Sequence, residues 1–201
     1  MPNSILSLIS STVKLVNQQV TRLTRPNMAL LLAASCCLTP GSVIAEKLSE
    51  EDKVKTALIY RLPKFVNWPD KVFENKPNEF RICIIGKDTL QSALEALKGR
   101  KVSSRSIVIK SPNLSNLKST NCHLLFISSS EKERIPQILN RLDKLSTLTI
   151  SDTPSFAENG GHIEIYRQGK HLAFRINNHT AKRAGLELAA PLLDMATIVK
   201  R

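Results

Sequence analysis

The stretch NCHLLFISSS, residues 121–130, begins polar, becomes apolar over four residues and ends in serines. A short continuous apolar run of this kind is typical of a strand that is buried on both faces, and we expect a strand at 123–129. A similar run, FRICIIG, predicts a strand at 80–86. Two shorter apolar runs, SIVIK at 106–110 and TLTIS at 147–151, predict two more strands.

Helical patterns alternate with these strands. The segments 50–66, 89–98 and 133–145 carry apolar residues at three- and four-residue steps, and Ser49 is the expected N-cap of the first. In that first helix the apolar stripe consists of Val54, Ala57, Leu58, Leu62, Phe65 and Val66. The segment HIEIYRQGKHLAFRIN, 162–177, predicts a hairpin that turns at Gln168 and Gly169, and a last helix is predicted over about 179–198.

Strands that alternate with helices favour parallel pairing, because a crossover helix returns the chain to the same edge of the sheet. The predicted fold class is therefore α/β: a single domain, 46–201, with a largely parallel sheet flanked by helices, a C-terminal antiparallel hairpin and a terminal helix. There are no internal repeats and no linker within this range.

The first 45 residues resemble a secretory signal peptide. They contain Lys14, Arg22 and Arg25 but no acidic residue, and an apolar run of eleven follows at 28–38. That run is too short to cross a bilayer, which takes about 20 residues. Small residues at 43–45 precede a charged segment, so we expect cleavage after Ala45 and export to the periplasm. A buried helix or a true anchor is the alternative interpretation.

The exported chain is basic. Residues 46–201 retain 26 of the 29 Lys and Arg against 17 Asp and Glu, a formal charge of +9. The charges are spread along the chain and do not interleave with aromatic residues, so nothing points to nucleic acid. The balance favours an acidic or membrane-proximal partner.

Only Cys83 and Cys122 remain after removal of the signal peptide. Two cysteines in an oxidising compartment are normally joined, so a disulfide is expected, with free buried thiols as the alternative. A zinc site is disfavoured because His123 lies beside Cys122 without the ligand spacing that zinc sites use. No metal and no cofactor are predicted.

No catalytic motif is present. The chain lacks GxGxxG, GxxxxGK[ST], GxSxG and HExxH, and its four histidines are scattered. Asp152 follows the strand at 147–151, where α/β folds place their sites, although a turn or cap explains it better. We therefore predict a protein that is not an enzyme.

Two regions could contact a partner. Trp68, the only tryptophan, lies in the proline-bounded loop NWP and either covers the core or anchors a partner. Leu186 and Leu193 widen the apolar face of the predicted last helix beyond its core stripe. A wide face suits a partner protein or a second copy in a homodimer, and complete burial explains it equally well.

Six segments, in order, resemble the YfiR family of periplasmic regulators. They are YRLPKFVNWP at 60–69, FRICIIGKDTL at 80–90, GRKV at 99–102, CHLLFISSSE at 122–131, LTISDTPSFAENGGHIEI at 148–165 and FRINNHTAKRAGLELAAPLLDMA at 174–196. The resemblance implies a non-catalytic protein that binds the periplasmic domain of an inner-membrane diguanylate cyclase and represses it, which lowers cyclic di-GMP and biofilm formation. It also implies that Cys83 and Cys122 form a family disulfide, while a second, more C-terminal pair of some members is missing here.

Two other functions remain open at the level of sequence. One is a periplasmic small-ligand sensor that acts on a membrane sensor histidine kinase, which a deep apolar pocket lined by Trp68 or by residues 159–161 would favour. The other is a hydrolase, which would need a histidine and an acid beside a serine.

Overall fold

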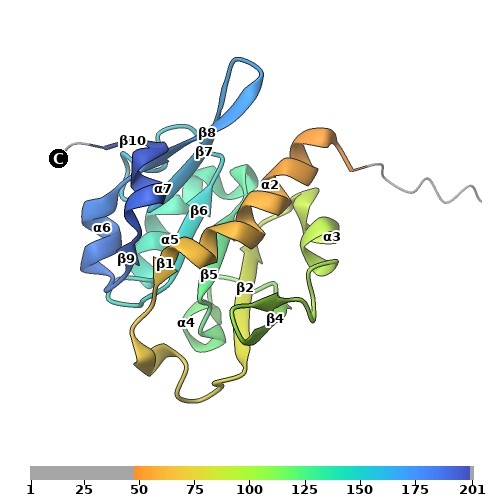
Figure 1. The fold of residues 1–201 in the computed structure, drawn as a ribbon, viewed down its shortest axis with the longest axis vertical. Helices are drawn as coiled ribbons and strands as arrows, with labels where there is room; N and C mark the ends of the chain where they lie inside the picture. The colour runs from red at the N-terminus through yellow and green to blue at the C-terminus, as the bar shows by residue number, and fades with distance from the viewer. Residues whose placement is uncertain (1–47, 200–201) are drawn as a thin grey trace, which may run out of the picture. The chain divides into compact units, whose positions relative to one another are not determined.

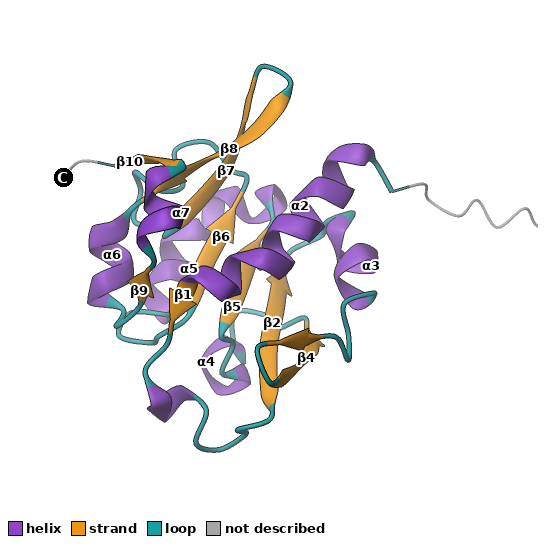
Figure 2. Cartoon of the chain, in the orientation of Figure 1, coloured by secondary structure: helices purple, strands orange, loops and turns teal. Residues whose placement is uncertain are grey.

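The computed structural model describes residues 48–199, which lie within one compact unit of the chain, and the predicted signal peptide at 1–45 falls outside them. The centre is an eight-stranded sheet (Figures 1 and 2). Its five middle strands run parallel, as the fold-class prediction requires. In spatial order they are β4 (Arg105–Lys110), β2 (Glu79–Ile85), β5 (Leu124–Ile127), β6 (Leu148–Ser151) and β7 (Ile163–Gln168).

Strands of opposite direction close both edges of this parallel centre. At one edge β3 (Lys101–Val102) pairs antiparallel with β4. At the other edge β8 (His171–Ile176) pairs antiparallel with β7, which confirms the predicted hairpin, and β10 (Ala196–Ile198) runs parallel to β8. The tip of the β7–β8 hairpin projects away from the sheet (Figure 1).

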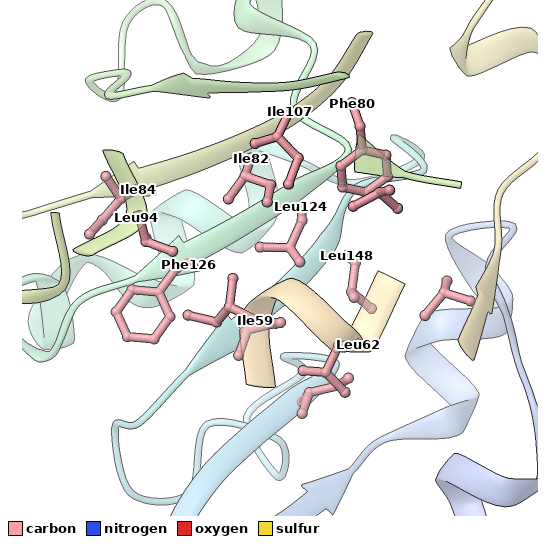
Figure 3. Close-up of a cluster of buried hydrophobic side chains, with 14 of the residues drawn as sticks. Ile59, Leu62, Phe80, Ile82, Ile84, Leu94, Ile107, Leu124, Phe126 and Leu148 are labelled. Carbon is pink, nitrogen blue, oxygen red and sulfur yellow. The ribbon is translucent and has the colours of Figure 1, made fainter. Parts of the chain in front are cut away.

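The two faces of the sheet carry two hydrophobic cores, because side chains alternate along each strand. From β2, Ile82 and Ile84 enter the larger core, while Cys83 and Ile85 enter the smaller one. The helix α2 (Glu50–Arg61) and the helix α3 (Leu90–Glu95) cover the larger core, and Figure 3 shows Ile59 of α2 near Phe126. The helices α4 (Leu117–Thr120) and α5 (Ile135–Arg141) cover the smaller core.

The helix α2 begins as predicted but buries another face. The Ser49 side chain accepts a hydrogen bond from the Asp52 amide at 3.0 Å, which confirms the N-cap. Within α2 the buried residues are Lys55, Thr56 and Ile59, whereas Val54 is 48% exposed, so this part of the predicted stripe is wrong. Its later members Leu62 and Val66, beyond the end of α2, are buried as predicted. The Lys55 ammonium lies 2.6 Å from an Asp152 oxygen at the end of β6, which holds this face toward the sheet.

Short 3-10 turns replace parts of the predicted long helices. Because Pro63 has no amide hydrogen to donate, α2 ends at Arg61 and continues as the 3-10 turn η1 (Leu62–Phe65), short of the predicted end at residue 66. The helix predicted at 133–145 begins as the 3-10 turn η3 (Ser129–Arg134) and becomes α5 only at Ile135.

The single terminal helix expected over 179–198 is not formed. The segment contains instead α6 (Asn178–Arg183), β9 (Glu187–Leu188), α7 (Ala190–Asp194) and β10. Gly185 ends the first helix because it adopts a φ of 75°, which side-chain-bearing residues avoid. Pro191 is the second residue of α7, in the first turn, where its missing amide hydrogen costs nothing. Between these helices, β9 pairs antiparallel with β1 (Val66–Asn67), a second, two-stranded sheet.

Candidate functional site

Trp68 follows β1 directly and is half-buried. Its indole Nε1 donates a hydrogen bond to the His123 carbonyl oxygen at 3.2 Å. Its ring meets Phe80 edge to face, with centroids 5.2 Å apart and an interplanar angle of 82°. Trp68 is therefore held in one orientation by both its polar and its apolar parts, with some of its surface still exposed.

Trp68 is the end of a series of rings that contact one another. Phe80 of β2 stacks on His123 at 5.2 Å, and His123 lies against Phe73 at 4.6 Å. The guanidinium of Arg105, the first residue of β4, lies 3.7 Å from the centroid of Phe73. We call Trp68, Phe80, His123, Phe73 and Arg105 the ring stack. Three of its members lie within residues 68–80, and Arg105 and His123 come from two later segments of the sequence.

His123 is the centre of the ring stack and is neutral. Its Nδ1 accepts a hydrogen bond from the Arg81 amide at 2.8 Å, so the proton is on Nε2, which lies 3.2 Å from the Val72 carbonyl oxygen and donates to it. Burial is the main cause that lowers the pKa of His123 to about 4, and the guanidinium groups of Arg81 and Arg105 lower it further, against the hydrogen bond to Val72. His123 thus acts as a flat ring with fixed hydrogen bonds.

A cavity of about 330 Å³ lies beside the ring stack. Trp68, Phe73 and Phe80 provide aromatic walls, while Asn67, Asp70 and Arg105 provide polar groups. The Nε of Arg105 is buried and has no hydrogen-bond partner within residues 48–199. An aromatic wall with an unpaired cationic donor suits an apolar group that carries a carboxylate.

Cys83 and Cys122 are joined by a disulfide, with their Cα atoms 5.9 Å apart. Both sulfurs belong to the smaller core, on the face of the sheet opposite the ring stack. Cys122 directly precedes His123, whose backbone amide donates to the Arg81 carbonyl at 2.9 Å. The covalent bond therefore fixes the segment from which the central ring of the stack extends.

The other two residues predicted to contact a partner are less exposed than expected. Leu186 is 0% exposed, so it could touch a partner only if its surroundings opened. Leu193 is half-buried and packs on the larger core. The pairing of β9 with β1 does bring this segment near Trp68: a Cβ placed on Gly185 would lie 3.9 Å from Pro69.

Asp152 belongs to an ion-pair network. Lys55 contacts both Asp152, at 2.6 Å, and Glu51, at 3.0 Å, and Arg167 of the hairpin pairs with Glu51. Burial acts to lower the pKa of the Lys55 ammonium, but its hydrogen bonds to Asp152 and Glu51 outweigh burial and raise it. The network ties α2 to β6 and to the hairpin, which agrees with a structural role for Asp152.

No hydrolytic triad assembles in the part of the chain that the structure describes. No histidine side chain at 48–199 is hydrogen-bonded to a serine hydroxyl, and His162 is buried, with its Nδ1 accepting from the Thr149 amide at 3.1 Å. Within the same residues, no group of three or more His, Cys, Asp and Glu side chains could hold a metal ion. Nor does any helix there combine the length and apolarity that a membrane crossing requires.

Sequence reasoning singled out Trp68 but none of the other members of the ring stack, which are Phe73, Phe80, His123 and Arg105. The signal that could have found them is the density of aromatic residues: a tryptophan and two phenylalanines within 68–80, in a chain with only 4% aromatic residues. The contribution of Arg105 follows only from the pairing of β3 with β4, where it lies opposite Val102.

Two solved structures show limited likeness to the chain. A conserved domain protein from Vibrio cholerae O1 biovar El Tor shares 13% identity, with 65% of this chain and 58% of that chain covered and a TM-score of 0.49. The ABC domain in complex with L-Trp from Streptococcus pneumoniae shares 10% identity, with coverage of 71% and 62% and a TM-score of 0.46. The chain thus spans about three fifths of the length of each.

No curated protein matches the sequence. The family described as YfiR/HmsC-like does match, over residues 52–197. That range includes every strand of both sheets except the last residue of β10, together with the whole ring stack and the disulfide. The chain belongs to the YfiR/HmsC-like family.

Proposed function

We propose that this chain is a non-catalytic periplasmic regulator that binds the periplasmic domain of an inner-membrane diguanylate cyclase and represses it, which lowers cyclic di-GMP and biofilm formation. The observation that carries the proposal is the family match, which extends over 52–197. Membership implies a regulatory protein of cyclic di-GMP signalling rather than an enzyme. The basic charge of residues 46–201 is compatible with an acidic partner.

The contact is proposed to centre on Trp68. Aromatic side chains that are half-exposed and rigidly held are frequent anchors in interfaces, because little conformational entropy is lost when they bind. The Trp68 ring is fixed by its hydrogen bond to the His123 carbonyl and by Phe80. Leu193, half-buried in the neighbouring segment, is a secondary contact, and Leu186 contributes by supporting it from the core.

The test is a deletion strain complemented with variants. Deletion should raise cyclic di-GMP and surface attachment, and the wild-type gene should restore both. Trp68→Ala should fail to restore them although folded protein accumulates in the periplasm. Val54→Ala, which removes an apolar side chain that is 48% exposed on α2, is the matched control and should complement fully. Unchanged cyclic di-GMP in the deletion strain would refute a cyclase partner.

The cavity beside Trp68 favours a second candidate function, a small-ligand sensor that acts on a membrane sensor histidine kinase. A second cavity, of about 380 Å³, is lined by Asn159 and Gly160 together with charged residues such as Lys144 and Arg183. This second function predicts that deletion alters the output of a sensor kinase while cyclic di-GMP stays constant. The same strains therefore separate the two candidates.

A further inference from the structure

Four basic residues lie around Tyr60 and the cavity beside Trp68. Lys64 and Arg100 lie over the ring of Tyr60, 6.0 Å and 5.0 Å from its centroid. The Tyr60 hydroxyl donates to the Lys101 carbonyl at 3.1 Å, which ties α2 to β3. Arg105 follows across the β3–β4 turn, opposite Val102. We call Lys64, Arg100, Lys101 and Arg105 the basic face.

The charge of the basic face is not compensated within the described residues. None of its four cations is among the ion pairs at 48–199, whereas Lys55, Arg167 and Arg175 all have acidic partners there. Two carboxylates lie nearby: Asp70 lines the cavity, and Glu187 is opposite Asn67 in the β1–β9 pair. Neither is within 4.0 Å of a nitrogen of the basic face, and four cations against two acids leave a net charge of +2.

The surroundings of Arg105 favour the binding of a carboxylate. Its guanidinium lies over the Phe73 ring, 3.7 Å from the centroid, and Arg105 lines the cavity. Its buried Nε is unpaired in the described part of the chain. A buried donor without a partner is unfavourable, so an arriving carboxylate would relieve that cost and neutralise the charge together.

The arrangement favours an extended ligand over a small one. The cavity involves Arg105 but not Lys64, Arg100 or Lys101, which surround Tyr60 outside it. A small carboxylate in the cavity would leave these three cations without a counter-charge. A polypeptide segment with several acidic residues can reach all four, and steering by such a surface raises the rate of association.

On the basis of the proposed function, we infer that the basic face and the cavity beside Trp68 together dock an acidic segment of the partner protein. One Asp or Glu side chain of that segment pairs with Arg105, and a neighbouring apolar side chain enters the cavity against Trp68 and Phe73. The remaining acidic residues of the segment lie along Lys64, Arg100 and Lys101.

The first arm of the test needs no cyclase. Because Trp68 is the only tryptophan, its fluorescence reports on this site alone. Titration of the oxidised exported protein with poly-L-glutamate should change the fluorescence saturably and in a salt-sensitive manner. Arg105→Glu should weaken the apparent affinity by about tenfold or more, and Lys101→Glu should weaken it in the same direction. Arg141→Glu on α5 makes the same charge change at an exposed residue of the helix that covers the opposite face of the sheet, and should alter affinity less than about twofold.

Controls exclude other ligands and misfolding. Acetate at equal carboxylate concentration and phosphatidylglycerol vesicles should produce no comparable change, and a response to acetate as strong as that to poly-L-glutamate would overturn the extended site. Arg105→Lys keeps the charge but loses the planar stacked group, so it should bind with intermediate affinity. Thermal unfolding identifies any variant that fails to fold. Equal binding by folded Arg105→Glu and wild-type protein would overturn the inference.

The second arm uses the purified periplasmic domain of each diguanylate cyclase encoded by the same organism. Arg105→Glu should weaken the complex as in the first arm, and reversal of one acidic residue on the cyclase domain should restore it. Binding of poly-L-glutamate without binding of any cyclase domain would support the acidic site and refute the proposed function. If a cyclase domain bound and the binding were insensitive to Arg105→Glu, the result would support the proposed function and refute the acidic docking site.

Discussion

At the scale of single residues, His123 should make the protein sensitive to mild acid. Above about pH 6.5 its imidazole is neutral in the folded and the unfolded chain, so it adds no pH dependence. Between 6.5 and its folded pKa of about 4, the unfolded chain binds a proton that the folded protein does not bind. Stability therefore falls as the pH falls through this window, and the loss is complete below it.

The variant His123→Asn removes this titration. Urea unfolding across the window should show a slope that is smaller by about 1.4 kcal/mol per pH unit than in the wild type. His162→Asn should act in the same way, because burial also lowers the pKa of His162 to about 4. Phe80→Leu disturbs the ring stack without removing a titrating group, so it should lower stability at every pH and leave the slope alone. If the slope in His123→Asn equalled that of the wild type, His123 would not be a source of the pH dependence.

Removal of the disulfide should be costly. The bond joins residues 39 positions apart, and closing a loop of that size stabilises a fold by about 4 kcal/mol on the chain-entropy argument. Cys122→Ser should lower the free energy of unfolding by roughly that amount. The double variant Cys83→Ala, Cys122→Ala avoids a lone thiol and is the cleaner measurement. If oxidised and reduced wild-type protein unfolded at the same denaturant concentration, the bond would contribute nothing.

Trp68 was within reach of sequence reasoning because it is unique and lies between an asparagine and a proline. The remainder of the site was not. Phe73, His123 and Arg105 gain their roles from contacts between separate segments, and nothing local distinguishes them from ordinary core or surface residues. Leu186 is buried, which is one of the two outcomes that the sequence left open, because an apolar residue on a wide helical face and one in a buried loop have the same sequence pattern.

At the scale of elements, the end of β2 should tolerate no side chain at Gly86. This residue adopts a φ of 96°, and a Cβ there would lie 2.6 Å from Ser130 Oγ and 3.0 Å from Ser128 Cβ. Gly86→Ala should lower the unfolding free energy by about 3 kcal/mol, the sum of backbone strain and crowding. Gly99→Ala is the matched control: its φ is 79°, but no atom lies within 4 Å of the added Cβ. Thermal or chemical denaturation compares the two variants. Equal losses of unfolding free energy would mean that the side chains around residue 86 move and relieve the crowding.

Four strands of the parallel centre, β4, β2, β5 and β6, were predictable because each is a short apolar run, which burial on both faces demands. The fifth, β7, was predictable as one arm of the hairpin. Apart from α4, which was not predicted, the helices were predictable in existence but not in extent. Pro63, Gly185 and Pro191 each interrupt a pattern that periodicity alone would continue. The buried face of α2 was missed because an ion pair between Lys55 and Asp152 turns a charged side chain inward, against its usual preference.

At the scale of the whole molecule, export determines whether the disulfide can form. We expect the exported protein to begin at or near Glu46, since the acid-free basic segment, the apolar run and the small residues at 43–45 resemble those of a cleaved signal peptide. Intact mass measurement of periplasmic protein should show a chain that lacks residues 1–45 and carries no free thiol. Recovery of the full chain from Met1 in a cytoplasmic fraction would contradict export.

The bond between Cys83 and Cys122 also decides how two neighbouring strands align. Ile82 lies opposite Leu124 and Ile84 opposite Phe126, yet a slide of β5 by two residues would keep every apolar side chain on its own face. Burial distinguishes these alignments weakly, but a slide of about 6.6 Å would carry the sulfurs out of reach. The bond thus excludes the shifted alignment. Protein that is refolded before oxidation should contain a population with β5 misaligned, which hydrogen exchange of the β5 amides would detect. Protein that is refolded with the bond intact should lack this population.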